Sequence, residues 1–352
     1  MALALGGGGA RGLAHLGVLE VLRAEGVRPA LIAGTSMGGL IGALAGACAD
    51  PDEMLRIARR FRMPGGVLPG KLLVWDEIFP SAVDLLRDMM FADLSTPLAV
   101  SAVDLHSGEE VALRSGPLLP AIRATCAVPG VFVPERLGTR CLVDGGVTNM
   151  LPVDLAWTCE PDVVIAVNIV ATVRSTPWPD SRTGRLAMML GRFVPNPWTA
   201  RFSYAVAMRA VEIALDRQRA MAVAMTGPEM LIDIDLSDVA LTDFHRIDEI
   251  VDAGRAATLS ALPRLHVVRE AAPRKGDRVD PAPALHVDPV CRMTISASRA
   301  RATAQWKGVT YYFCTSSCRD AFLMHCDRYA PAPTDASGGS PDDLARNDRI
   351  RE

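Results

Sequence analysis

Residues 3–17, LALGGGGARGLAHLG, join a short apolar run to an apolar helical pattern through four consecutive glycines. Gly7, Gly9 and Gly12 fit the G-x-G-x-x-G pattern of a dinucleotide-binding turn between a strand and a helix. A glycine-rich turn that directs backbone N–H groups to one point can equally hold the oxyanion of an acyl-transfer reaction. The stretch therefore predicts a strand, a tight turn and a helix that together form an anion site.

A second glycine-rich turn decides between these two anions. Residues 34–38, GTSMG, match G-x-S-x-G, which places Ser36 on a sharp turn between an apolar strand and a helix of small residues. A dinucleotide site needs an acidic residue about 20 positions after the glycines, and here the next strand ends in the Ser36 turn instead. No Gly-Lys-Ser/Thr follows the glycines, so the P-loop is excluded as well. The two turns together favour a hydrolase with Ser36 as its nucleophile.

Apolar runs recur along the first three quarters of the chain, in MALAL, ALIAG, LAVSAVDL, DVVIAVNIV and MLIDIDL. Runs without polar alternation are typical of strands covered on both faces, so we expect an α/β fold with a mostly parallel central sheet. Helical patterns lie between the runs. Asp50 before Pro51, with Glu53 at the capping-box position, predicts the start of one helix.

Composition excludes several other classes of protein. The 352 residues carry a net charge of -3 and 5% aromatic residues without a basic stripe, so we expect no nucleic-acid partner. The N-terminus lacks the basic region and cleavage site of a signal peptide, which predicts a cytoplasmic protein. Residues 30–49 lack charge over the length of a membrane span, but their five glycines favour a strand, a turn and a buried helix.

Three motifs in order, GGGGARG, GTSMGG and CLVDGGV, resemble the bacterial type of the patatin-like phospholipase family over residues 1–265. The resemblance implies a three-layer α/β fold and a serine acyl hydrolase that needs no cofactor. Ser36 and Asp144 would form the catalytic dyad, and Gly7, Gly8 and Gly9 the oxyanion hole. The other motif residues would support these groups: Arg11, Gly12, Gly34, Gly38, Gly145 and Gly146. One departure is Val133, where many members of the family have proline.

The expected reaction cleaves carboxylic ester bonds of phospholipids, lysophospholipids or related lipids. A free aspartate has a pKa of about 3.9 and is a weak base, so we expect Asp144 to be partly desolvated. A Ser-Asp-His order would nominate His245 as the base instead, whereas a dyad leaves His245, His15 and His106 without a catalytic role. Arg11 is expected to fix the glycine loop by pairing with a carboxylate or with carbonyl groups.

The chain changes character after Leu265, and a charged, proline-bearing linker is predicted over residues 266–285. Residues 286–330 resemble the YHS domain, a small module linked to metal binding, and residues 331–352 are polar enough to be disordered. Three cysteines of the YHS-like segment, Cys291, Cys314 and Cys318, are candidate ligands for a zinc or copper ion. Cys326, His325 and His286 are the candidates for a fourth ligand. The alternative is a small core of free thiols without metal.

Residues 178–209 combine arginines, among them Arg182, Arg185, Arg192 and Arg201, with tryptophan and bulky apolar side chains, a composition that suits an anionic membrane interface. The same pattern also fits a helix packed in the core. A second hypothesis for the whole chain is a metal-responsive regulatory protein with a vestigial hydrolase domain. The sequence names neither the lipid nor the oligomeric state.

Overall fold

The computed structural model describes residues 1–48, 50–62, 72–170, 197–271, 285–290, 294–297 and 300–330. The chain divides into two compact units, Met1–Leu285 and His286–Glu352. The division falls where the second module was expected to begin. The predicted tail, residues 331–352, lies outside the described residues.

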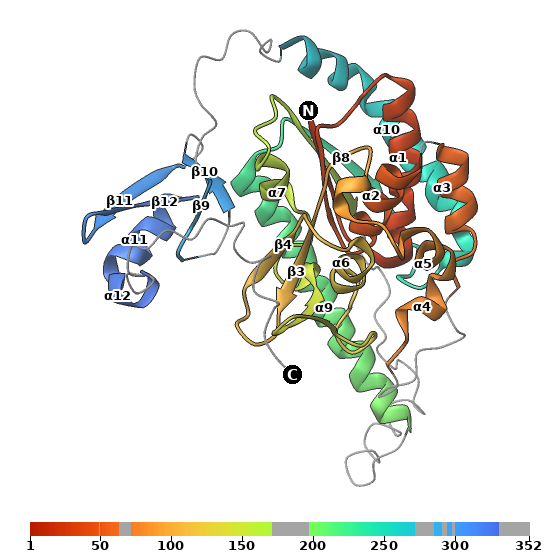
Figure 1. Ribbon diagram of the computed structural model, residues 1–352, viewed down its shortest axis with the longest axis horizontal. Helices are drawn as coiled ribbons and strands as arrows, with labels where there is room; N and C mark the ends of the chain where they lie inside the picture. The colour runs from red at the N-terminus through yellow and green to blue at the C-terminus, as the bar shows by residue number, and fades with distance from the viewer. Residues whose placement is uncertain are drawn as a thin grey trace, which may run out of the picture. The chain divides into compact units, whose positions relative to one another are not determined.

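A mostly parallel sheet forms the centre of the first unit (Figure 1). Its parallel part has the order β3-β2-β1-β7-β8, and an antiparallel part continues from β3 through β6 to β5, with β4 paired to β3. The five apolar runs are confirmed as strands: β1 (Ala2–Leu5), β2 (Leu31–Thr35), β3 (Leu98–Asp104), β7 (Val164–Val170) and β8 (Met230–Asp235). The antiparallel strands are β4 (Glu110–Leu113), β5 (Glu135–Leu137) and β6 (Arg140–Asp144).

Helices cover both faces of this sheet and give it three layers. Along β1, Leu3 and Leu5 belong to the larger core cluster, while Ala2 and Ala4 belong to a second cluster on the opposite face. The larger cluster packs under α1 (Ala14–Ala24), α2 (Met37–Ala47), α3 (Pro51–Ala58), α5 (Pro80–Leu86), α6 (Leu118–Thr125) and α10 (Ile247–Ala271). The second packs under α7 (Val153–Trp157) and α9 (Pro197–Thr226) (Figure 1).

Helices α1 and α10 pack with their backbones in direct contact. A Cβ atom added at Gly17 would collide with the carbonyl oxygen of Val251, and one at Gly254 would collide with that of Ala14. The pair therefore requires a glycine on each helix at the crossing point.

Two helix ends test the expectations from the sequence. The predicted start at Asp50 is confirmed, because its side chain accepts a hydrogen bond from Asp52 N at 3.0 Å and Pro51 opens α3. The linker, expected from residue 266, begins later, since α10 continues to Ala271. Leu265 is fully buried and Val268 packs against the core, whereas the charged residues on either side of them, Arg264, Arg269 and Glu270, are exposed.

The second unit is built from short strands and two helices. Strand β9 (Leu285–Val287) pairs with β10 (Thr294–Ser296), and β11 (Ala302–Trp306) pairs with β12 (Val309–Phe313). Helices α11 (Ser316–Met324) and α12 (Cys326–Tyr329) follow. Phe313, Phe322 and Cys326 form its core.

Within the described part of the chain, no helix has both the length and the apolar character needed to cross a bilayer. Residues 30–49, which lack charge, contain β2 and α2.

Candidate active site

Ser36 lies at the carboxyl end of β2 and caps the N-terminus of α2. Its φ of 55° and ψ of −125° hold the side chain on a sharp turn, and Ser36 N donates to Thr125 Oγ1 at 2.9 Å. Glycines at Gly34 and Gly38 permit the turn, because a Cβ at the first would lie 2.6 Å from Gly39 and one at the second would collide with Leu5. Ser36 is only 6% exposed. The sequence motif thus folds into the strained strand-to-helix turn expected of it.

Asp144 ends β6 and is 4% exposed. Its backbone N–H donates to Ala127 O at 3.0 Å, and its Oδ1 accepts from Gly146 N at 2.8 Å. Gly145 fits flat against β3, where a Cβ would collide with the carbonyl group of Ser101. The two glycines after Asp144 therefore set the direction of its carboxyl group.

The side chains of Ser36 and Asp144 lie next to each other, although they come from the ends of β2 and β6, which flank β3 on either side. Burial raises the pKa of Asp144 to about 6, and hydrogen bonding to the Ser36 side chain and to Gly146 N opposes the rise. Asp144 Oδ2 meets no donor at full hydrogen-bond geometry among the residues described, so the contact with Ser36 is a loose one. Catalytic hydrogen bonds are often long before substrate binds. The expectation that Asp144 is desolvated is confirmed.

The glycine loop reaches the same place from β1. A Cβ at Gly7 would lie 3.2 Å from Ser36 Cβ. The N–H of Gly7 is already used, because it donates to Met150 O at 2.9 Å. For the N–H groups of Gly8 and Gly9, the described residues supply no acceptor. Of the three donors expected from the sequence, Gly7 N–H anchors the loop, while the N–H groups of Gly8 and Gly9 remain candidates for an oxyanion hole.

Two further contacts hold the loop in place. Gly12 fits against α2, since a Cβ there would lie 2.6 Å from Met37 Cβ. Ala10 N donates to Leu241 O at 2.8 Å, in the segment between β8 and α10. The loop therefore packs against α2, the helix that Ser36 caps, and is hydrogen-bonded to the segment that follows β8.

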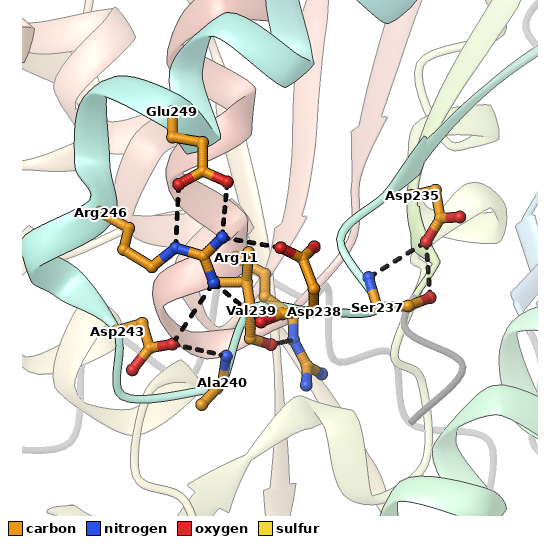
Figure 2. Close-up of polar contacts among 9 residues, drawn as sticks. All are labelled: Arg11, Asp235, Ser237, Asp238, Val239, Ala240, Asp243, Arg246 and Glu249. Carbon is orange, nitrogen blue, oxygen red and sulfur yellow. Dashed lines mark hydrogen bonds and ion pairs between the residues drawn. The ribbon is translucent and has the colours of Figure 1, made fainter. Parts of the chain in front are cut away.

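Arg11 is buried and ties the loop to that segment, as expected. Its Nε donates to Val239 O at 2.6 Å, and its Nη2 lies 3.8 Å from Glu212 Oε1 on α9. Figure 2 shows how Arg246 holds the segment itself, through Asp238 at 2.7 Å and Glu249 at 2.9 Å. The hydrogen bond of Arg11 to Val239 O and the ion pairs of Arg246 thus connect the glycine loop to the start of α10.

The histidines lie elsewhere. His245 is exposed, and within the described residues no hydrogen bond joins it to Ser36 or Asp144. His106 is exposed in the turn after β3. His15 is fully buried under the glycine loop, with Nε2 2.7 Å from Gly6 O, and burial lowers its pKa to about 4. His15 is therefore neutral and supports the loop backbone.

Sequence reasoning missed Thr125 and Met150, which hold Ser36 N and Gly7 N respectively. Thr125 uses its side chain and Met150 its carbonyl group, and neither residue type signals such a contact in a single sequence. Both contacts join parts of the chain that only the fold brings together.

In the second unit, Cys314 Sγ lies 3.7 Å from Cys318 Sγ, and the carboxyl group of Asp288 completes a cluster within 4.8 Å. Both Asp288 oxygens accept backbone N–H groups, from Val290 and from Cys314. Cys291, the third expected ligand, lies outside the described residues. Cys326 is buried in the core of the unit.

Comparison with known proteins places both units. The patatin-like phospholipase model matches residues 3–64 and 73–157, and the YHS domain model matches residues 286–333. An uncharacterized NTE family protein of Mycobacterium tuberculosis is 33% identical over 201 residues, which cover 55% of this chain and 55% of that protein. The patatin-like phospholipase domain-containing protein 6 of Mus musculus is 29% identical over 276 residues, which cover 72% of this chain and 20% of that protein.

The matched segments thus span about half of the mycobacterial relative and a fifth of the mouse protein. Among solved structures, VipD from Legionella pneumophila aligns over 74% of this chain and 66% of its own at 12% identity, with a TM-score of 0.43. The chain therefore carries a patatin-like phospholipase domain in its first unit and a YHS domain in its second.

Proposed function

We propose that this protein is a serine acyl hydrolase that cleaves carboxylic ester bonds of phospholipids, lysophospholipids or related lipids. Membership of the patatin-like phospholipase family supports lipid hydrolysis in general. The observation that carries the proposal is the meeting of Ser36, on its strained turn, with the desolvated carboxyl group of Asp144.

Ser36 Oγ attacks the ester carbonyl carbon while Asp144 Oδ2 takes the hydroxyl proton. The tetrahedral oxyanion accepts hydrogen bonds from the backbone N–H groups of Gly8 and Gly9. Collapse breaks the bond to the alcohol, which leaves with the proton from Asp144, and the acyl group stays on Ser36. Water then attacks this ester, with Asp144 again as base, and releases the fatty acid and the free serine.

The environment of Asp144 suits this role. With a pKa of about 6 the carboxyl group is still mostly ionised at neutral pH, yet it is a stronger base than a free aspartate. Each oxyanion donor is typically worth about 10² to 10³ in rate, so Gly8 and Gly9 would supply a large part of the catalysis. No step calls on a cofactor.

A screen of lipid classes tests the proposal and names the substrate. Purified protein is incubated with phospholipids, lysophospholipids and neutral glycerides, and released fatty acid is measured. We expect release from at least one class, and none from the Ser36→Ala variant. Release that survives in Ser36→Ala would assign the activity to another group or to a contaminant.

We also propose that residues 178–209 contact anionic membranes. Residues 178–196 lie outside the described residues, and the remainder opens α9. The support is the sequence itself, which combines arginines with bulky apolar side chains in one stretch. Replacement of Arg185 and Arg192 by Glu should lower turnover on anionic vesicles and leave a short soluble ester unaffected. Equal loss on both substrates would contradict this.

We propose further that the YHS domain binds a thiophilic metal ion. Two thiolates that share a tetrahedral zinc ion at about 2.3 Å are about 3.8 Å apart. The 3.7 Å between Cys314 Sγ and Cys318 Sγ fits this distance. Cys291 would supply a third thiolate, and zinc or copper are the candidates. Asp288 is the less suitable ligand, because backbone N–H groups already engage its oxygens.

A further inference from the structure

A cluster of buried polar side chains lies beside the Asp144 turn, and none of them is a reacting group in the proposed mechanism. Ser101 Oγ donates to Glu110 Oε1 at 2.7 Å. The side-chain amide of Asn149 donates to Glu110 Oε1 at 2.9 Å and to Asp154 Oδ1 at 2.8 Å. One amide thus connects two carboxyl groups from different elements, β4 and α7.

The two carboxyl groups are held close together away from water. Ser101, Asn149 and Asp154 are buried, and Glu110 keeps some exposure as a residue although its carboxyl group is desolvated. The groups that face Glu110 are Ser101 from β3, Asn149 from the turn and Asp154 from α7. No positive charge acts on Glu110 from the described residues. Burial, and then Asp154, raise the pKa of Glu110 well above its ordinary value.

The backbone beside Asn149 is hydrogen-bonded to all three motifs of the site. Asn149 O accepts from Thr35 Oγ1, one residue before the nucleophile, at 2.8 Å. Met150 O accepts from Gly7 N at 2.9 Å. Asn149 N donates at 2.8 Å to the carbonyl group of Gly145, the residue after Asp144. A shift of this short segment would therefore move nucleophile, glycine loop and base relative to one another.

We propose that Glu110 is a positioning residue of the active site, which fixes residues 145–150 through the side-chain amide of Asn149. The inference rests on the proposed function, because it assigns Glu110 a role in that same reaction. Neutral Glu110 accepts hydrogen bonds from Ser101 and from the Asn149 amide, which also donates to Asp154. Ionised Glu110 would repel Asp154 across the amide that they share, and the segment would shift.

Two pH effects follow from this arrangement. Activity should fall on the alkaline side as Glu110 ionises, while the acid side follows Asp144. Because the pKa of Glu110 is raised in the native state, Glu110 stabilises the fold most at a pH below the ordinary glutamate pKa. This contribution to the free energy of unfolding is lost as pH rises to the raised pKa. Above the raised pKa it changes no further.

The test compares Glu110→Gln, Glu110→Ala and the exposed neighbour Glu109→Gln as a matched control. Gln keeps the acceptor at Oε1 and removes the ionisable oxygen. For each variant, kcat and KM on a short soluble ester, the rate of Ser36 labelling by a fluorophosphonate, and the thermal unfolding midpoint are measured across pH. The thermal unfolding midpoint separates a misplaced site, where activity and labelling fall in a folded protein, from a lost fold.

We expect Glu110→Gln to keep near-normal kcat at neutral pH and to lose the alkaline fall of the wild type. Glu110→Ala should lose between about tenfold and about a hundredfold in kcat with KM little changed, as expected when reacting groups are misplaced. Glu109→Gln should follow the wild type. An alkaline fall that persists in Glu110→Gln, or a normal kcat in Glu110→Ala, would overturn the inference.

Failure of the proposed function gives a different pattern. A wild-type protein that is neither labelled at Ser36 nor able to cleave the ester would overturn both proposals. Normal wild-type labelling that neither Glu110 variant alters would overturn only the role of Glu110. If Glu110→Ala does not fold, the pH profile of Glu110→Gln decides alone.

Discussion

The backbone of Ser36 lies in a region that residues with a side chain seldom occupy, with φ at 55° and ψ at −125°. Such a conformation costs about 1–3 kcal/mol and persists only where the surroundings enforce it. Here the hydrogen bond to Thr125 Oγ1 and the close contacts of Gly34 and Gly38 enforce it. The strained turn places the Ser36 hydroxyl group at the carboxyl end of β2, where the carboxyl group of Asp144 can reach it.

If the turn is strained, the residue that the proposed reaction needs at position 36 is not the residue that makes the fold most stable. Ser36→Gly should raise the thermal unfolding midpoint relative to Ser36→Ala, because glycine adopts a positive φ without a Cβ clash. Both variants should lack hydrolysis. Differential scanning calorimetry of the two proteins checks the difference. A Ser36→Gly protein less stable than Ser36→Ala would mean that the turn is not strained.

Asp144 predicts the acid side of the pH profile. The base must be ionised, so kcat/KM should rise as pH increases through about 6, the pKa that burial gives this carboxyl group. Asp144→Asn should lose hydrolysis to a similar degree as Ser36→Ala, since the dyad acts as one unit.

The same pKa gives a stability effect of opposite sign. A raised pKa means that native Asp144 resists ionisation, so its contribution falls as pH rises from 3.8 to about 6. Asp144→Asn should therefore be at least as stable as the wild type at neutral pH. Thermal unfolding at several pH values measures this, and a clearly less stable Asp144→Asn would contradict the desolvation of Asp144.

Much of the site at this scale could be predicted from short motifs. Ser36, Asp144 and the glycine loop stand in short motifs, whose glycines are needed because the backbone turns sharply or packs closely there. The use of Gly7 N by Met150, and the cluster around Glu110, could not be predicted. Those contacts join residues far apart in the chain, and no local pattern records them.

At the scale of elements, the packing of α1 against α10 fixes the position of α1, and the glycine loop leads directly into α1. Gly254→Ala should destabilise the protein by about 1–3 kcal/mol or more, because the new methyl group would collide with the backbone of Ala14. Ser260→Ala, on the exposed side of α10, serves as the control and should change stability by less than about 0.5 kcal/mol. Urea unfolding of both variants measures the effect. Equal stability of the two would contradict the close packing of the helices.

The parallel strands were predictable because both of their faces are covered, which leaves continuous apolar runs. The short antiparallel strands β4, β5 and β6 carry no such signal, since charged and apolar residues mix in GEEVAL and PERLGTRCLV. The end of α10 was misplaced for a similar reason. Leu265 and Val268 face the core, while charged residues around them suggest a linker.

At the scale of the whole molecule, the two units have separate cores, and the proposed hydrolysis and the proposed metal site fall in different units. Replacement of Cys314 and Cys318 by Ser should abolish metal binding, because it removes both thiols of the close pair. Elemental analysis of purified wild-type protein and variant measures this. Hydrolysis of a short soluble ester should be unchanged, since the dyad and the glycine loop lie in the first unit. Wild-type protein that takes up neither zinc nor copper under reducing conditions would favour a core of free thiols.

The division of the chain was predictable from composition, because charged and proline-bearing residues separate two patterned regions. The substrate was not, since the lipid is selected by the shape and charge of surfaces that a motif does not describe. Membrane contact is proposed for residues 178–209, and residues 178–196 of that stretch lie outside the described residues.

Fluorophosphonate labelling followed by peptide mass spectrometry most directly tests the assignment of Ser36 as a nucleophile activated by Asp144. The probe reacts with an activated serine and forms a stable adduct, whatever the natural lipid is. We predict one adduct, on the peptide that contains Ser36, absent in Ser36→Ala, strongly reduced in Asp144→Asn and unchanged in His245→Ala. An adduct on another serine, or labelling lost in His245→Ala and kept in Asp144→Asn, would contradict the assignment.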